Sequence, residues 1–158
     1  MYIPLNGALN EGLADFWGWV YTRDEGFISR SLPLLTSQRK VSNELKQLPE
    51  KSFFEELAKV ENVQSQVEVS YCLGTYFSRF MRRLADTEGA EAVAADLLNK
   101  LARARGKGLG EIGPKVLLSI LFPTSGDLNS SRCGLVKSFM APTADGDEFT
   151  KACADGAR

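Results

Sequence analysis

A repeating apolar pattern between residues 69 and 84 constrains the fold more than any other part of the sequence. Its apolar side chains recur at the i, i+3, i+4, i+7 spacing, as Val69, Cys72, Leu73, Tyr76, Phe77, Phe80 and Leu84. This spacing places them on one face of a helix that packs against a core. Residues 63–69 also alternate apolar and polar side chains, which is typical of a strand. The longer pattern nevertheless favours a helix there, and Gly74 within it would allow a second helix to approach closely.

Shorter patterns with the same spacing occur along the rest of the chain. They predict helices that start near Asn10, Thr36, Ser52, Asp86 and Pro114, and a short one around Phe139. The expected core residues are Leu13, Phe16, Trp17, Leu57, Leu73, Tyr76, Phe77, Phe80, Leu97, Leu101 and Leu118. Trp19 lies off the first apolar face. We favour a helix buried on two sides at that point, and the alternative is an exposed aromatic ring for a partner or a stacked base.

The fold class follows from these patterns. Helical spacing dominates and strand signals are few, so we predict an all-α protein, a single-domain helical bundle of about six or seven helices with at most minor strand content. Its length of 158 residues suits one domain with a hydrophobic core. The helical domain is expected to span residues 1–140, and a small, polar and acidic tail to follow at 141–158.

The absence of histidine lowers the expectation of an enzyme. Histidine is the commonest general base and the commonest metal ligand, and the chain has none. We therefore predict a protein that is not an enzyme, with no catalytic residue, cofactor or metal site. An enzyme that uses carboxylates or a cysteine stays a third possibility.

The three cysteines and the lack of targeting signals bear on location. Cys72, Cys133 and Cys153 are widely spaced and form no CxxC pair. This spacing argues against a zinc site or a disulfide scaffold and for a reducing, cytoplasmic or otherwise intracellular compartment. Cys72 is expected in the core and Cys153 in an exposed tail. No secretory signal is apparent, and no apolar run approaches the roughly 20 residues needed to span a bilayer, so no membrane association is expected.

A glycine-rich basic turn at residues 106–115 joins two of the predicted helices. Residues 108–113, GLGEIG, match the G-x-G-x-x-G pattern of dinucleotide-binding folds, but a basic helix precedes them where that fold requires a strand. The phosphate-loop pattern also fails, because Pro114 occupies its lysine position. Pro114 is suited to the first position of a helix, whose free amides beside Lys115 make a generic anion site. Residues 98–115 hold five cations and one acid, in a chain whose net charge is −1.

This turn resembles the hairpin of the helix-hairpin-helix nucleic-acid binders, which reads Gly-hydrophobic-Gly-Pro-Lys-Thr-Ala between two apolar helices. The chain has Glu111-Ile112-Gly113-Pro114-Lys115-Val116-Leu117 in that position, and the resemblance is confined to residues 97–121. It implies that the Gly113 amide and Lys115 contact the nucleic-acid backbone without reading its sequence. Glu111 and Leu117 depart from the family pattern, which has glycine and alanine there.

The sequence therefore predicts a binding protein that holds nucleic-acid phosphates through this basic hairpin, in a role such as packaging or a coat. The expected anion-binding residues are Arg103, Arg105, Lys107, Gly113, Lys115, Arg82 and Arg83. Arg82 and Arg83 also fit a second role, since cations near a helix C-terminus complement its dipole. The alternative function is a helical assembly or adaptor module that binds protein partners, or copies of itself, without nucleic acid.

Overall fold

The computed structural model describes residues 3–28, 39–48, 63–104, 118, 122, 127–140 and 153. Within these ranges it contains four helices and no strand: α1 (Ile3–Thr22), α4 (Val63–Glu88), α5 (Ala90–Ala104) and α7 (Ser130–Phe139). The predicted all-α class is confirmed. The predicted total of six or seven helices is not confirmed, and the expected helices that start near Ser52 and Pro114 lie outside the described residues.

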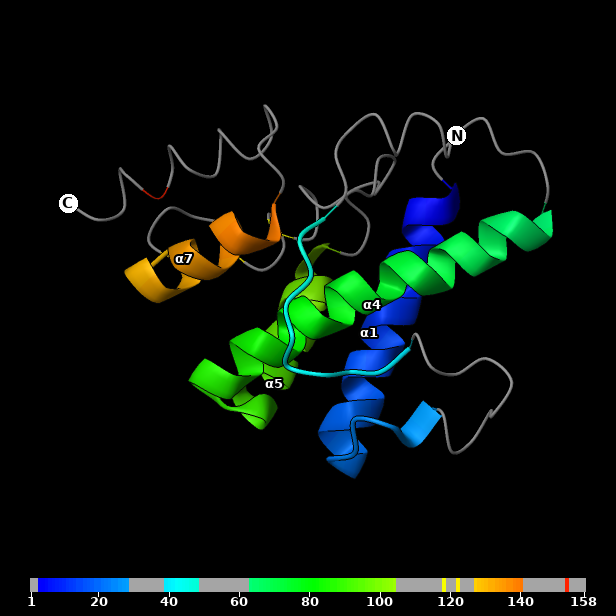
Figure 1. The fold of residues 1–158 in the computed structure, drawn as a ribbon. Helices are drawn as coiled ribbons and strands as arrows, with labels where there is room; N and C mark the ends of the chain where they lie inside the picture. The colour runs from blue at the N-terminus through cyan, green and yellow to red at the C-terminus, as the bar shows by residue number, and fades with distance from the viewer. Residues whose placement is uncertain are drawn as a thin grey trace.

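Helices α1 and α4 cross closely at the centre of the molecule (Figure 1). Gly12 of α1 faces Gly74 of α4 at the crossing, and a β-carbon added at Gly12 would lie 2.6 Å from the Gly74 carbonyl oxygen. Nearer the start of α1, a β-carbon added at Gly7 would lie 2.8 Å from the Ser70 hydroxyl oxygen of α4. Small residues on both helices thus bring the two backbones together. The close approach expected at Gly74 is confirmed, as is the helical conformation of residues 63–69.

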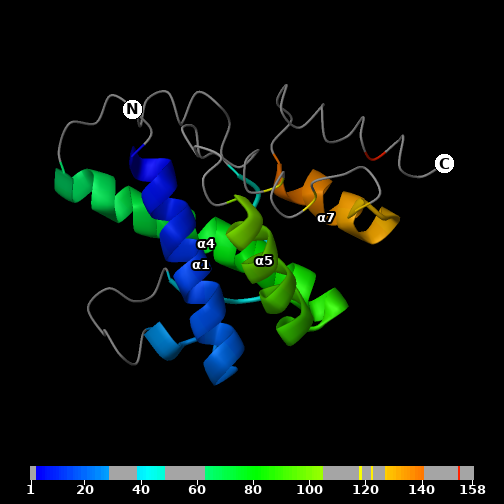
Figure 2. The same ribbon diagram turned by 180° about the vertical axis from the view of Figure 1, so that it is seen from behind.

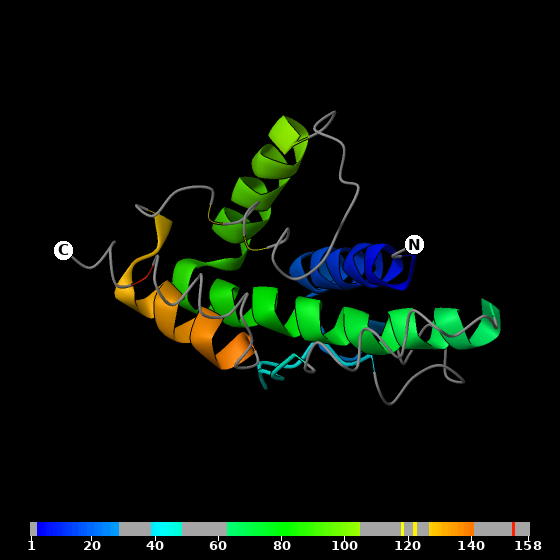
Figure 3. The ribbon, with the colours of Figure 1, turned by 90° about the horizontal axis from the view of Figure 1, so that it is seen from above.

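The other two helices pack against the half of α4 that leads to its C-terminus. Gly89, with φ of +91°, ends α4 and lets the chain turn into α5, because this backbone conformation suits glycine. Figure 3 shows α5 leading away from the end of α4, and α7 beside α4 on another side. Seen from behind, α5 lies between α1 and α7 (Figure 2).

Two predicted helix starts were wrong. Helix α1 begins at Ile3 rather than at Asn10, because Ala8 and Leu9 are buried and extend the contact with α4. Pro4 is tolerated there, since the first turn of a helix lacks backbone acceptors for its amides. Helix α4 runs through Asp86 to Glu88, so Asp86 lies in its last turn rather than capping the next helix.

The helix predicted after Thr36 is also wrong in its described part, because residues 39–48 form no helix. Val41 and Leu48 are buried as expected, but they reach the core from an extended segment. The Val41 amide donates to the Glu25 carbonyl and the Leu48 amide donates to the Phe139 carbonyl, at 3.2 and 2.7 Å. These long-range bonds replace the local ones of a helix.

The buried side chains form one hydrophobic core that draws on all four helices and on residues 39–48. Of the predicted core residues, seven are buried: Leu13, Phe16, Leu73, Phe77, Phe80, Leu97 and Leu118. Trp17, Tyr76 and Leu101 are partly buried against this core, and Leu57 lies outside the described residues. Trp19 is buried, as we expected. In the described ranges, no helix has the length and apolar character to cross a bilayer.

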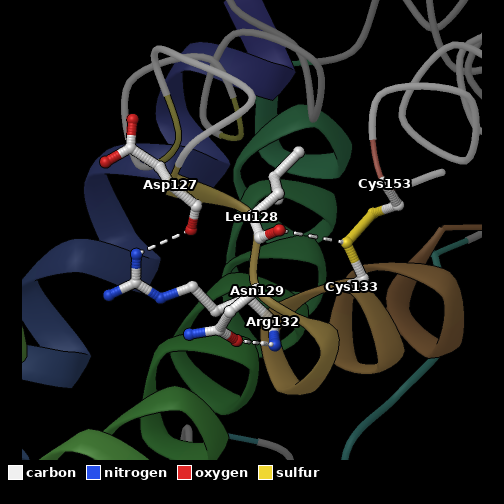
Figure 4. The surroundings of a disulfide bond; sticks show 6 residues. All are labelled: Asp127, Leu128, Asn129, Arg132, Cys133 and Cys153. Atoms are coloured by element: carbon white, nitrogen blue, oxygen red, sulfur yellow. Dashed lines mark hydrogen bonds between the residues drawn. A yellow bond between two sulfur atoms is a disulfide. The ribbon is translucent and has the colours of Figure 1, made fainter. Parts of the chain in front are cut away.

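The cysteines differ most from the sequence-based prediction. Cys133 on α7 forms a disulfide with Cys153, which is buried (Figure 4). Cys72 is the free thiol and is exposed, because it borders the apolar face of α4 on a side that the other described elements leave uncovered. The predictions of a buried Cys72, an exposed Cys153 and no disulfide were therefore wrong. The argument for a reducing compartment rested on unpaired thiols, and it fails with them.

Candidate functional site

The residues predicted to bind anions fall into two groups. Arg105, Lys107, Gly113 and Lys115 lie outside the described residues, so the hairpin itself stays a prediction. The other three lie on helices: Arg82 and Arg83 near the end of α4, and Arg103 in the last turn of α5. Helix α5 rises about 1.5 Å per residue, which separates Arg103 from the start of α5 by roughly 20 Å. The structure therefore does not bring the three arginines together.

Arg103 is exposed at the C-terminal end of α5. It forms no ion pair with any residue that the structure describes. Lys100, one turn earlier, pairs with Asp96 at 2.7 Å. The last turn of α5 therefore presents the Arg103 charge to solvent. In the sequence, Arg103 directly precedes the other cations of the hairpin, Arg105, Lys107 and Lys115.

Arg82 has a structural role. Its guanidinium lies 4.1 Å from the centroid of the Trp19 ring and pairs with Asp86. Arg23 approaches the same ring at 5.2 Å. Burial lowers the pKa of Arg82 from its ordinary value, although nearby Glu25 opposes that shift. The guanidiniums of Arg23 and Arg82 therefore lie against the buried Trp19 where α1 and α4 meet, and that of Arg82 is also paired with Asp86.

Arg83, the next residue, has a different environment. Its side chain is exposed and makes no ion pair in the described part of the chain. It lines a groove of about 580 Å³ formed by residues 43–47, the last turns of α4, and α7. Sequence patterns did not indicate this groove, because residues 43–47 were expected to be helical and the helix around Phe139 was expected to pack on the core.

One wall of the groove is fixed by Arg132 of α7. Its guanidinium donates to both carboxylate oxygens of Glu88, at 2.5 and 2.6 Å. It also donates to the Asp127 carbonyl at 2.7 Å (Figure 4). These contacts tie the start of α7 to the end of α4, and they neutralise the Arg132 charge. Arg83 is then the unneutralised cation among the described residues of the groove.

A second ion-pair cluster anchors the extended segment. Arg39 donates to Asp15 and Glu11 of α1 at 2.6 and 2.8 Å, and it lies over the Tyr71 ring of α4. Asp15 is buried, and that burial raises the pKa of its carboxyl above the ordinary value, although Arg39 opposes the shift. About two turns further along α4, Arg79 donates to the Lys40 carbonyl at 3.1 Å. Because these arginines hold residues 39–48 in place, the groove has a fixed wall.

Comparison with protein-family models, curated proteins and solved structures finds no match for this chain. Among the described residues, no group of three or more acidic, cysteine or histidine side chains could hold a metal ion. Of the residues predicted to bind anions, Arg103 at the end of α5 and Arg83 in the groove are the two that are described, exposed and without an ion pair to a described residue.

Proposed function

We propose that the protein is a non-enzymatic binding protein that holds the phosphate backbone of nucleic acid without reading its sequence. The contacts would come from Arg103, Arg105, Lys107 and Lys115, with the Gly113 amide in the turn. The observation that supports this best is Arg103, an exposed cation with no ion pair to a described residue, at the end of the helix that leads into the basic stretch.

The charge distribution supports the same proposal. Residues 98–115 have a net charge of +4, from five cations and one acid, in a chain of net charge −1. Such a local excess attracts phosphates, whereas the chain as a whole does not. Arg82 is left out of the proposed surface because Trp19 and Asp86 occupy its guanidinium.

The test is a binding titration of fluorescently labelled single strands and duplexes at low salt. Replacing Arg103 or Lys115 with alanine should each weaken binding about fivefold, equivalent to about 1 kcal/mol. Glu111→Gly should strengthen binding, because it removes a negative charge and restores the turn residue of the helix-hairpin-helix pattern. Lys137→Ala is the matched control, since Lys137 is an exposed cation in the last turn of α7. An equal loss of affinity in Lys137→Ala would reject the hairpin as the binding surface.

A second function, assembly through a helix surface, is favoured by the outer face of α5. Ala95, Leu98 and Ala102 follow helical spacing there and are all exposed, and Leu98 is 60% exposed. Light scattering after size exclusion distinguishes the two functions. An assembly protein should run as an oligomer without nucleic acid, and Leu98→Asp should return it to a monomer. A wild-type monomer would exclude self-assembly through this face.

A further inference from the structure

The groove between α4 and α7 has the size of a small-molecule site. Its volume of about 580 Å³ lies within the roughly 300–1,000 Å³ typical of ligand pockets. Residues 43–47 form one wall, Arg83 to Thr87 of α4 the second, and α7 the third. Arg132 and Glu88 join α7 to α4. The wall of residues 43–47 is tied to α7 at its end, where the Leu48 amide donates to the Phe139 carbonyl at 2.7 Å.

The charge in the groove favours an anion. Its described lining contains no aspartate or glutamate and two arginines, Arg83 and Arg132. Glu88 neutralises Arg132, and Arg83 has no ion pair to a described residue. A guanidinium presents several N–H groups in a planar fork that matches a phosphate or carboxylate. The groove therefore offers one unneutralised fork and no repelling charge in its described lining.

The remaining lining suits an organic phosphate better than a bare ion. Asn43, Gln47 and Ser131 add hydrogen-bonding groups to the lining. Leu45, Leu84 and Leu135 supply apolar surface on all three walls. A nucleotide combines the matching features: a charged phosphate, sugar hydroxyls, and a flat base that packs on apolar side chains while its edge pairs with amides.

We propose that this groove binds a nucleotide, with its phosphate on Arg83 and its base against the leucines. The nucleotide is either free or one unit of a single strand. Because Arg83 and Arg103 lie at different places in the fold, this site does not depend on the hairpin proposed above.

Gly134 provides a sharp test, because it lines the groove and a β-carbon added to it meets no atom within 4 Å. Gly134→Gln and Gly134→Glu place side chains of nearly equal size there, and they differ in charge. We expect adenosine monophosphate to shift the amide resonances of Ser131 and Gly134 in two-dimensional NMR of the full chain. Arg83→Ala should weaken this binding tenfold or more, the effect expected for losing a hydrogen bond to a charged group. Gly134→Glu should also weaken it, because its carboxylate repels the phosphate. Gly134→Gln should weaken it much less.

Further ligands show whether the phosphate is needed for binding and whether the groove takes free nucleotides or a single strand. Adenosine, which lacks the phosphate, should bind at least tenfold more weakly than the monophosphate if Arg83 holds the phosphate. A short single strand that shifts the same amides places a polymer in the groove, and its failure to do so assigns the groove to free nucleotides. The proposal is overturned if the monophosphate shifts no groove amide, if Gly134→Glu and Gly134→Gln bind it equally, or if an acidic peptide binds the groove more tightly. Arg103→Ala should leave this binding unchanged, whether or not the hairpin holds nucleic acid.

Discussion

Replacing Gly12 with alanine should destabilise the protein through the α1–α4 crossing. The new methyl group would lie 2.6 Å from the Gly74 carbonyl oxygen and 2.8 Å from the Phe77 β-carbon, so the two helices must separate. Overpacking typically costs about 1–3 kcal/mol, and we expect about 2–3 kcal/mol here because the nearest atom is a backbone oxygen that cannot rotate away. The higher helix propensity of alanine offsets about 1 kcal/mol of this. The unfolding free energy should therefore fall by about 1–2 kcal/mol.

Gly134→Ala is the matched control for this prediction. It makes the same substitution in a helix where the new methyl group meets no atom within 4 Å. Only helix propensity changes there, so stability should rise by about 0.5–1 kcal/mol. Urea unfolding followed by far-UV circular dichroism should show opposite shifts of the midpoint, with similar slopes. A Gly12→Ala protein at least as stable as wild type would refute the close crossing.

Two further predictions concern the core and the thiols. Phe77→Ala should lower the unfolding free energy by about 3–5 kcal/mol, because Phe77 is buried and packs edge-on against Phe139. A loss below about 1 kcal/mol in urea unfolding would show that Phe77 is not in the core. In the native protein without reductant, a thiol reagent should modify Cys72 alone, because the other two cysteines form a disulfide. Cys133→Ser should lower the unfolding free energy by about 3 kcal/mol through loss of this cross-link. Mass spectrometry that finds Cys153 labelled under these conditions would contradict the disulfide.

Helical spacing predicted the core well because that spacing is a local property. The face through Leu73, Phe77 and Phe80 follows directly from the order of residues 69–84, and these side chains are buried. The buried Trp19 also followed, since large aromatic rings mostly pack. The spacing depends on neighbours three or four residues away, and the ring size depends on one residue, so a single sequence displays both.

The features that failed depend on contacts between distant residues. The extended conformation of residues 39–48 is set by Arg39 bonding to α1 and by Leu48 bonding to α7. The Cys133–Cys153 disulfide depends on where the C-terminal segment lies relative to α7. The groove needs all three of its walls in place. No local pattern shows such pairings, so Arg83 and Arg82 looked equivalent in the sequence although the structure gives them different surroundings.

The salt dependence of nucleic-acid binding tests the proposed function most directly. If the basic hairpin holds phosphates, log K should fall linearly with log salt, with a slope of about −0.7 for each phosphate on single strands or −0.9 on duplexes. Replacing Arg105 and Lys115 together with alanine should weaken binding to all sequences alike and flatten the slope by about that amount for each lost contact. No binding at low salt, or a slope that ignores both substitutions, would contradict the proposal.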